Sequence, residues 1–179
     1  MFITLSKMDF SKGFNIQLAT LFGIGKIPGG GTLASLAVLL IALYEQNAET
    51  ASFLAFFTLI IGPRAYKRLI DNSEQEDPKE YVLDEVIGMG ISLSGVYIFY
   101  SIVGGFEFNI NFLSDIDALF ILTFICFRFF DISKIGPVGW VERNPNEKPY
   151  NKVIGDDIMA AILSILVVIM ILSIKLWVI

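Results

Sequence analysis

Long runs of uncharged, mostly apolar residues alternate with short polar segments along the chain. Residues 86–106 contain 21 consecutive residues without a charge and residues 158–174 contain 17, against the roughly 20 that a helix needs to cross a bilayer. Both runs are predicted to be membrane-spanning helices. Residues 27–44 form a third uncharged run of 18. Pro28 and the three glycines after it disfavour helix, so a helix is expected there from about Thr32.

Two further apolar runs are shorter, with 14 uncharged residues over 50–63 and 10 over 118–127. Each must extend through charged ends or stay buried among neighbouring helices. The chain is 55% hydrophobic, above the about 45–50% of ordinary soluble proteins. We predict an all-α fold with a single domain over residues 1–179, built as a polytopic membrane helical bundle of about five spans.

The basic residues are concentrated on one side of such a bundle. Five spans would place 12 of the 13 basic residues on the side of the N-terminus: Lys7, Lys12, Lys26, Arg64, Lys67, Arg68, Lys79, Arg128, Lys134, Arg143, Lys148 and Lys152. The other side receives the acidic segments 45–49 and 106–117, with Lys175. Because loops rich in lysine and arginine stay in the cytoplasm, the first side is predicted to be cytoplasmic.

Acidic residues mark the cytoplasmic ends of three of these runs. Asp84-Glu85 and Asp156-Asp157 each precede an apolar run, and Asp131 follows another. Interaction with a helix dipole, worth about 0.3–1 kcal/mol, explains at most one such pair. Clustered carboxylates repel each other unless a cation lies among them, and oxygen ligands from several helices suit Mg²⁺ or Ca²⁺. We therefore expect these five acids to form a divalent metal site on the cytoplasmic face.

Two cations flank Asp131 at intervals of three residues. On a helix continuing from Ala118, Arg128, Asp131 and Lys134 share one face. They form either an intrahelical ladder of ion pairs or part of a binding site. Charges near hydrocarbon are costly, which favours a functional role, and the two cations beside metal-bound carboxylates suit a phosphate group.

A glycine-rich segment, residues 22–32, precedes the third apolar run and contains five glycines. Its backbone N–H groups are expected to approach an anion at a helix N-terminus, with Lys26, Gly31 and Thr32 as phosphate-binding residues. A flexible re-entrant turn is the alternative.

Missing residue types narrow the chemistry further. The chain contains no histidine, which excludes a Ser-His-Asp triad, a phosphohistidine intermediate and a histidine-ligated zinc site. Cys126 is the single cysteine and is expected to have a packing role. The acidic pair in Asp115-Ile116-Asp117 is expected to lie in a loop on the side opposite to the other acids.

Four motifs, in this order, resemble the phosphatidylglycerophosphatase A family. They are Gly-x-Gly-x-x-Pro with Gly-Thr-x-x-Ser over 23–35, Leu83-Asp84-Glu85-Val86-Ile87-Gly88, Phe127-Arg128-Phe129-Phe130-Asp131-Ile132-Ser133-Lys134-x-x-Pro137, and Gly155-Asp156-Asp157-x-x-Ala160. The resemblance implies a Mg²⁺-dependent, multi-pass phosphatase of the bacterial inner membrane that converts phosphatidylglycerophosphate to phosphatidylglycerol.

Together, the resemblance and the residues predict a mechanism. Asp84, Glu85, Asp131, Asp156 and Asp157 hold Mg²⁺ and supply a general base, while Arg128 and Lys134 neutralise the phosphoryl oxygens. A covalent aspartyl-phosphate is the competing route. Substrate and membrane lipids are the expected partners, nucleic acid is not, and the oligomeric state stays open. The alternatives are a divalent-cation or anion transporter and a CDP-alcohol phosphotransferase, although the Asp-x-x-Asp-Gly-x-x-Ala-Arg signature of the transferase is absent.

Overall fold

A computed structural model describes residues 10–71, 78–104 and 114–178, and in these ranges the chain is helical with no strand. The elements are α1 (Phe10–Ala19), the 3-10 turn η1 (Ile24–Lys26), α2 (Gly30–Glu45), α3 (Glu49–Ile70), α4 (Leu83–Ile102), α5 (Asp115–Ser133), α6 (Pro137–Glu142) and α7 (Pro149–Val178). The all-α prediction is therefore confirmed. The predicted connection 106–113 and Lys7 lie outside the described residues.

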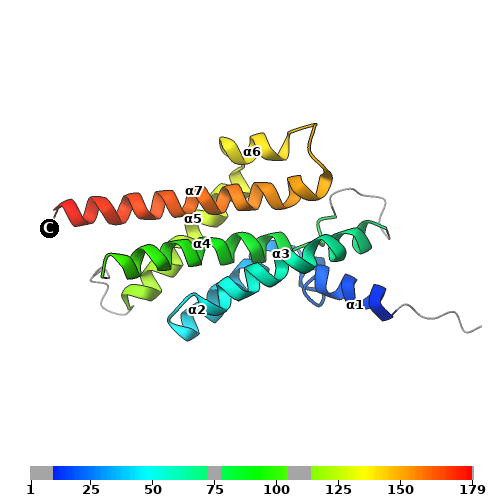
Figure 1. The fold of residues 1–179 in the computed structure, drawn as a ribbon, viewed down its shortest axis with the longest axis horizontal. Helices are drawn as coiled ribbons and strands as arrows, with labels where there is room; N and C mark the ends of the chain where they lie inside the picture. The colour runs from blue at the N-terminus through cyan, green and yellow to red at the C-terminus, as the bar shows by residue number, and fades with distance from the viewer. Residues whose placement is uncertain (1–9, 72–77, 105–113, 179) are drawn as a thin grey trace, which may run out of the picture.

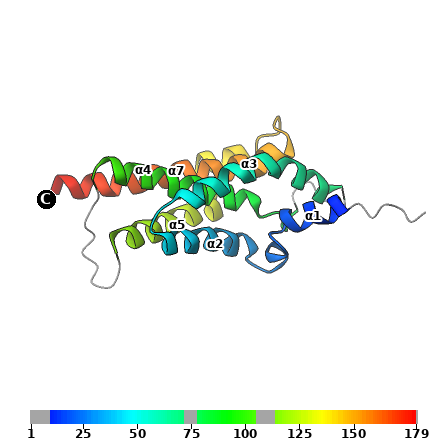
Figure 2. The same cartoon turned by 60° about the horizontal axis from the view of Figure 1, so that its bottom comes forward.

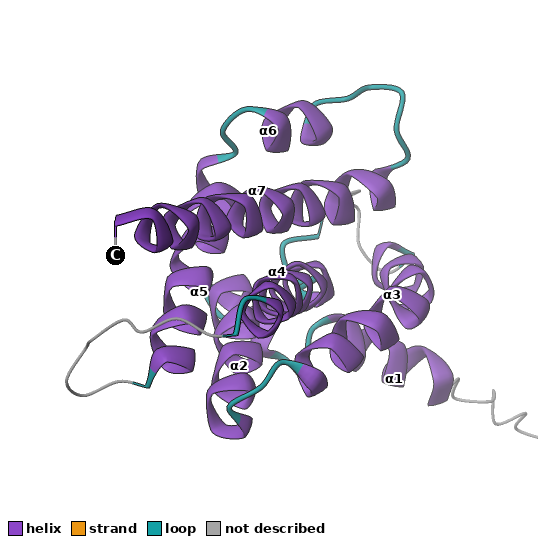
Figure 3. Ribbon diagram, turned by 60° about the vertical axis from the view of Figure 1, so that its left-hand side comes forward, coloured by secondary structure: helices purple, strands orange, loops and turns teal. Residues whose placement is uncertain are grey.

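The long helices run back and forth along one axis of the molecule (Figures 1 and 2). Viewed closer to this axis, α4 occupies the centre of the bundle (Figure 3), where it contacts α2, α3, α5 and α7. Its apolar side chains form much of the core, with Met89, Leu93 and Val96 fully buried. The start of α4, the first part of α7 and the end of α5 lie at the same end of the bundle.

Small residues let the other helices approach α4 closely. A Cβ atom at Gly90 would lie 2.6 Å from the carbonyl oxygen of Ala51 in α3. A Cβ at Gly88 would overlap the Phe127 ring of α5 and lie 3.1 Å from the carbonyl oxygen of Asp157 in α7. Glycine at these positions brings helix backbones together, as is common in membrane helix packing.

Only α4 and α7, among the described residues, are long and apolar enough to cross a membrane by length and composition. Helix α2 is apolar but has 16 residues. Helices α3 and α5, with 22 and 19 residues, include the charged ends that the short apolar runs were expected to need. The charges reduce their hydropathy, so the prediction of about five spans is not confirmed.

Large apolar side chains nevertheless cover the outside of the bundle. On α3, Phe53, Phe56, Phe57 and Ile60 are between 47% and 64% exposed. An exposed apolar surface of this kind is typical of contact with lipid or with another protein.

Three helix boundaries correct the sequence analysis. Asp115 and Asp117 are not in a loop, because Ser114 caps α5 in a capping box with Asp117 and so starts the helix there. Helix α5 ends at Ser133, and Lys134 follows it in a left-handed conformation with φ 49°. Helix α2 begins at Gly30, before the expected Thr32.

The Gly90 contact predicts that Gly90→Ala lowers the thermal unfolding midpoint in detergent, because overpacking against a backbone costs about 1–3 kcal/mol. Gly95→Ala on the same helix is the matched control: its new methyl group meets only the side chain of Ile165, which can move. Equal midpoints for the two variants would contradict the close approach of α3 and α4.

Candidate active site

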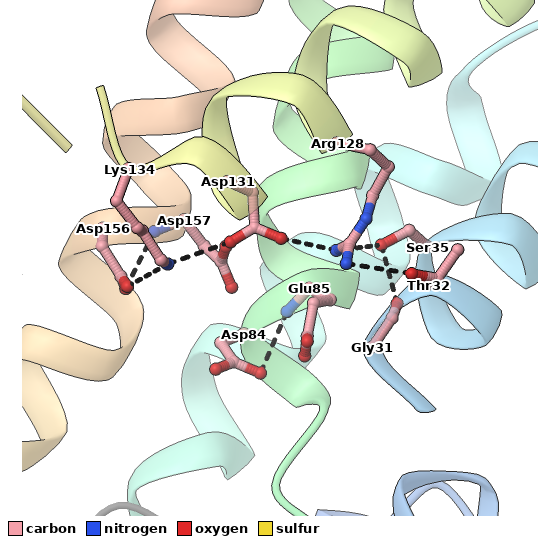
Figure 4. Close-up of polar contacts among 10 residues, drawn as sticks. All are labelled: Gly31, Thr32, Ser35, Asp84, Glu85, Arg128, Asp131, Lys134, Asp156 and Asp157. Carbon is pink, nitrogen blue, oxygen red and sulfur yellow. Dashed lines mark hydrogen bonds and ion pairs between the residues drawn. The ribbon is translucent and has the colours of Figure 1, made fainter. Parts of the chain in front are cut away.

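The five acids singled out in the sequence meet at one end of the bundle, around a cavity of about 270 Å³. Asp84 and Glu85 lie in the first turn of α4, Asp131 lies in the last turn of α5, and Asp156 and Asp157 come from α7. Figure 4 shows these side chains facing one another. Asp156 and Asp157 lie about two turns inside α7, so capping of a helix start does not explain them.

Three of these acids are close enough to share one cation. Carboxylate oxygens of Asp84, Glu85 and Asp157 all lie within 4.8 Å of one another. Asp157 is 3% exposed, and its Oδ1 atom and Oε2 of Glu85 are buried without a hydrogen-bond partner in the described part of the chain. Unpaired carboxylates this close repel each other, and a divalent cation with oxygen ligands would relieve that repulsion. The donor set therefore fits Mg²⁺.

The other two acids are paired with cations instead. Lys134 Nζ lies 3.0 Å from Asp131 Oδ1 and 2.5 Å from Asp156 Oδ2. Arg128 Nη1 lies 2.6 Å from Asp131 Oδ2. Burial alone would lower the pKa of the Lys134 ammonium, but the charges of Asp131 and Asp156 raise that pKa above its usual value. The predicted set of five acids is thus divided into an unpaired group of three and a cation-bound group of two.

Lys134 does more than extend a ladder along α5. Lys134 caps α5, and its amide donates to the carbonyl oxygen of Phe130. The chain leaves the helix at this residue. Its side chain joins α5 to α7 by binding one acid on each. The intrahelical alternative accounts for its contact with Asp131 but not for its contact with Asp156.

A second cavity of about 400 Å³ lies beside the first and is lined by the glycine-rich segment. Lys26, Gly31, Thr32 and Arg128 line this cavity, whereas Lys134 lines the first. The predicted phosphate-binding residues are therefore not all brought together.

Packing fixes the wall between the two cavities. A side chain at Gly31 would overlap the carboxylate of Glu85, which lines both. Arg128 donates from Nη2 to Thr32 Oγ1 at 3.1 Å and from Nη1 to Ser35 Oγ at 3.3 Å, which ties α5 to the start of α2.

The comparison with known families supports the resemblance. Residues 17–172 match the family model described as Phosphatidylglycerophosphatase A, and this range contains every acid and cation of both cavities. The chain belongs to the phosphatidylglycerophosphatase A family. No curated protein and no solved structure matches the chain significantly. Membership of the phosphatidylglycerophosphatase A family implies a phosphatase that acts on phosphatidylglycerophosphate.

Sequence reasoning missed Tyr81, which lines the first cavity. Burial, with the neighbouring Tyr150 and Asp84, raises the pKa of its hydroxyl well above the usual value, so the hydroxyl keeps its proton. It also packs edge-on against Tyr66 of α3, with ring centroids 5.3 Å apart. Its position three residues before Asp84 was the only signal in the sequence.

The bridge between α5 and α7 predicts that Lys134→Met destabilises the protein by about 1–3 kcal/mol, because the largely buried Asp156 carboxylate loses its cation, whereas Asp131 keeps Arg128. Adding Asp156→Asn to this variant is expected to recover part of the loss, since it removes the carboxylate that Lys134 no longer neutralises. Unfolding midpoints of the wild type, both single variants and the double variant measure the coupling. Strictly additive losses would contradict the bridge.

Proposed function

We propose that this protein is a Mg²⁺-dependent phosphatase of the bacterial inner membrane, which converts phosphatidylglycerophosphate to phosphatidylglycerol and phosphate at the cytoplasmic face. The main supporting observation is the group of Asp84, Glu85 and Asp157, three unpaired carboxylates beside a lysine in one cavity. Family membership supplies the substrate. The placement of all the acids at one end of the helices favours hydrolysis over transport, because transporter sites usually lie near the bilayer midplane.

In this proposal the five acids and Lys134 divide the work in the first cavity. Asp84, Glu85 and Asp157 would hold Mg²⁺, which when bound polarises a phosphoryl oxygen and lowers the pKa of a bound water. The Lys134 ammonium neutralises charge that develops on the phosphoryl oxygens. Asp131 and Asp156 orient this ammonium through the contacts already described, and one carboxylate of the cavity takes a proton from the attacking water.

In this proposal, helices α4 and α7 anchor the protein in the bilayer. Helices α2, α3 and α5 pack around α4 and complete five spans. The exposed aromatic face of α3 supports this arrangement, because it would otherwise place several phenylalanines in water. The concentration of basic residues around the acid-lined end favours a cytoplasmic active site.

The metal assignment predicts that Asp157→Asn lowers phosphate release from phosphatidylglycerophosphate by about 10²-fold, because loss of a ligand charge weakens metal binding. EDTA is expected to abolish release by the wild type, and added Mg²⁺ to restore it. Glu147→Gln, at an exposed position outside both cavities, is the matched control and should keep full activity. Phosphate release that survives complete chelation would overturn the proposed metal dependence.

The topology predicts opposite labelling of two positions in a Cys126→Ala background. A cysteine introduced by Glu49→Cys, at the start of α3, should react in intact cells with a thiol reagent that cannot cross the inner membrane. The cells are first treated so that the reagent can pass any outer envelope. One introduced by Asn146→Cys, just before α7, should react only after the cytoplasmic face is opened. Labelling of both positions from the same side would contradict an odd number of spans between them.

A further inference from the structure

The two cavities differ in chemistry although they share a wall. The first is lined mostly by charged groups, including all five acids of the site and Lys134. The second is lined by three cations, by two acids, and by backbone and apolar side chains of the glycine-rich segment. Glu85 and Lys79 line both cavities, so the two cavities are adjacent.

Hydrogen-bond donors in the second cavity remain available. Gly29, the residue before α2, has no side chain that could cap the helix. The amides of Gly31 and Thr32 donate to no other described residue. These are two of the N–H groups that a helix start leaves open to an anion. Nε of Arg128 is also buried without a partner, and the Lys26 side chain reaches the same cavity from an exposed position.

The acids of the second cavity do not cancel this preference. Glu85 belongs to the carboxylate group assigned to the metal and Arg128 is paired with Asp131, which leaves Glu80 against Lys26 and Lys79. The lining also contains apolar residues, Ile27 and Pro28, and Ile27 is 53% exposed. A ligand here therefore combines an anion with an attached apolar part.

The substrate carries two phosphates of different kinds. In phosphatidylglycerophosphate one glycerol separates the terminal phosphomonoester, which is hydrolysed, from a phosphodiester, which is attached to the diacylglycerol. We propose that the second cavity binds this phosphodiester, through Lys26, Arg128 and the amides of Gly31 and Thr32, while the monoester lies in the first cavity. The proposal rests on the proposed function and adds a reason for selectivity between phospholipids. A lipid with a single phosphate cannot place a phosphate in both cavities.

The test compares Lys26→Met with the wild type in detergent. Substrates are phosphatidylglycerophosphate and phosphatidic acid, whose only phosphate is a monoester. Inhibitors are phosphatidylglycerol, which keeps only the diester, and inorganic phosphate. Loss of the Lys26 charge is expected to raise both KM for phosphatidylglycerophosphate and Ki for phosphatidylglycerol by about tenfold. It should leave kcat, Ki for inorganic phosphate and any hydrolysis of phosphatidic acid unchanged.

Two matched variants act as controls. Lys148→Met removes an exposed lysine that lines neither cavity and should change none of these constants, which separates the site from a general attraction of cations to anionic lipid. Lys26→Arg keeps the charge and should stay close to the wild type. All variants are compared at equal folded concentration, measured by thermal unfolding.

The possible outcomes separate this proposal from the proposed function. A Lys26→Met protein with unchanged constants, or with the same loss for both substrates and for inorganic phosphate, would overturn the diester site and leave the phosphatase intact. A wild-type protein that releases no phosphate from phosphatidylglycerophosphate would instead overturn the proposed function itself.

Discussion

Electrostatic repulsion among five carboxylates is the constraint on which this end of the molecule depends. Three helices bring these groups together beside an apolar bundle, where unpaired charge is costly. The structure relieves part of the repulsion with its own cations, since Lys134 and Arg128 bind Asp131 and Asp156. Among the described residues, no lysine or arginine forms an ion pair with Asp84, Glu85 or Asp157. That residual negative charge is what makes a divalent cation the natural complement of the site.

Close helix packing is what brings the carboxylates together. Gly88 of α4 lies against both the Phe127 ring of α5 and the backbone of Asp157 in α7, so a side chain there would push apart the helices that carry the acids. Gly31 has the same effect on a smaller scale, because its missing side chain leaves space for the carboxylate of Glu85. Conformational freedom is secondary at these two positions, where the requirement is for space.

The wall shared by the two cavities connects the unpaired acids to the glycine-rich segment. Glu85 belongs to the unpaired acids and also faces the glycine-rich segment. Arg128 binds Asp131 of the first cavity and Thr32 of the second. Glu85 and Arg128 therefore link the positions of the side chains around the two cavities.

The sequence by itself determined the helical class, the apolar character of each long helix, the four motifs and the five acids that line the first cavity, because periodicity, charge spacing and glycine content are local properties of the chain. Only the tertiary structure decided that Lys134 binds Asp156 on another helix, that three acids rather than five remain unpaired, and that Lys26, Gly31 and Thr32 lie in a second cavity. It also corrected both ends of α5 and the start of α2. These features depend on how far one helix lies from another and how each is rotated, which is set by side-chain packing between segments distant in sequence.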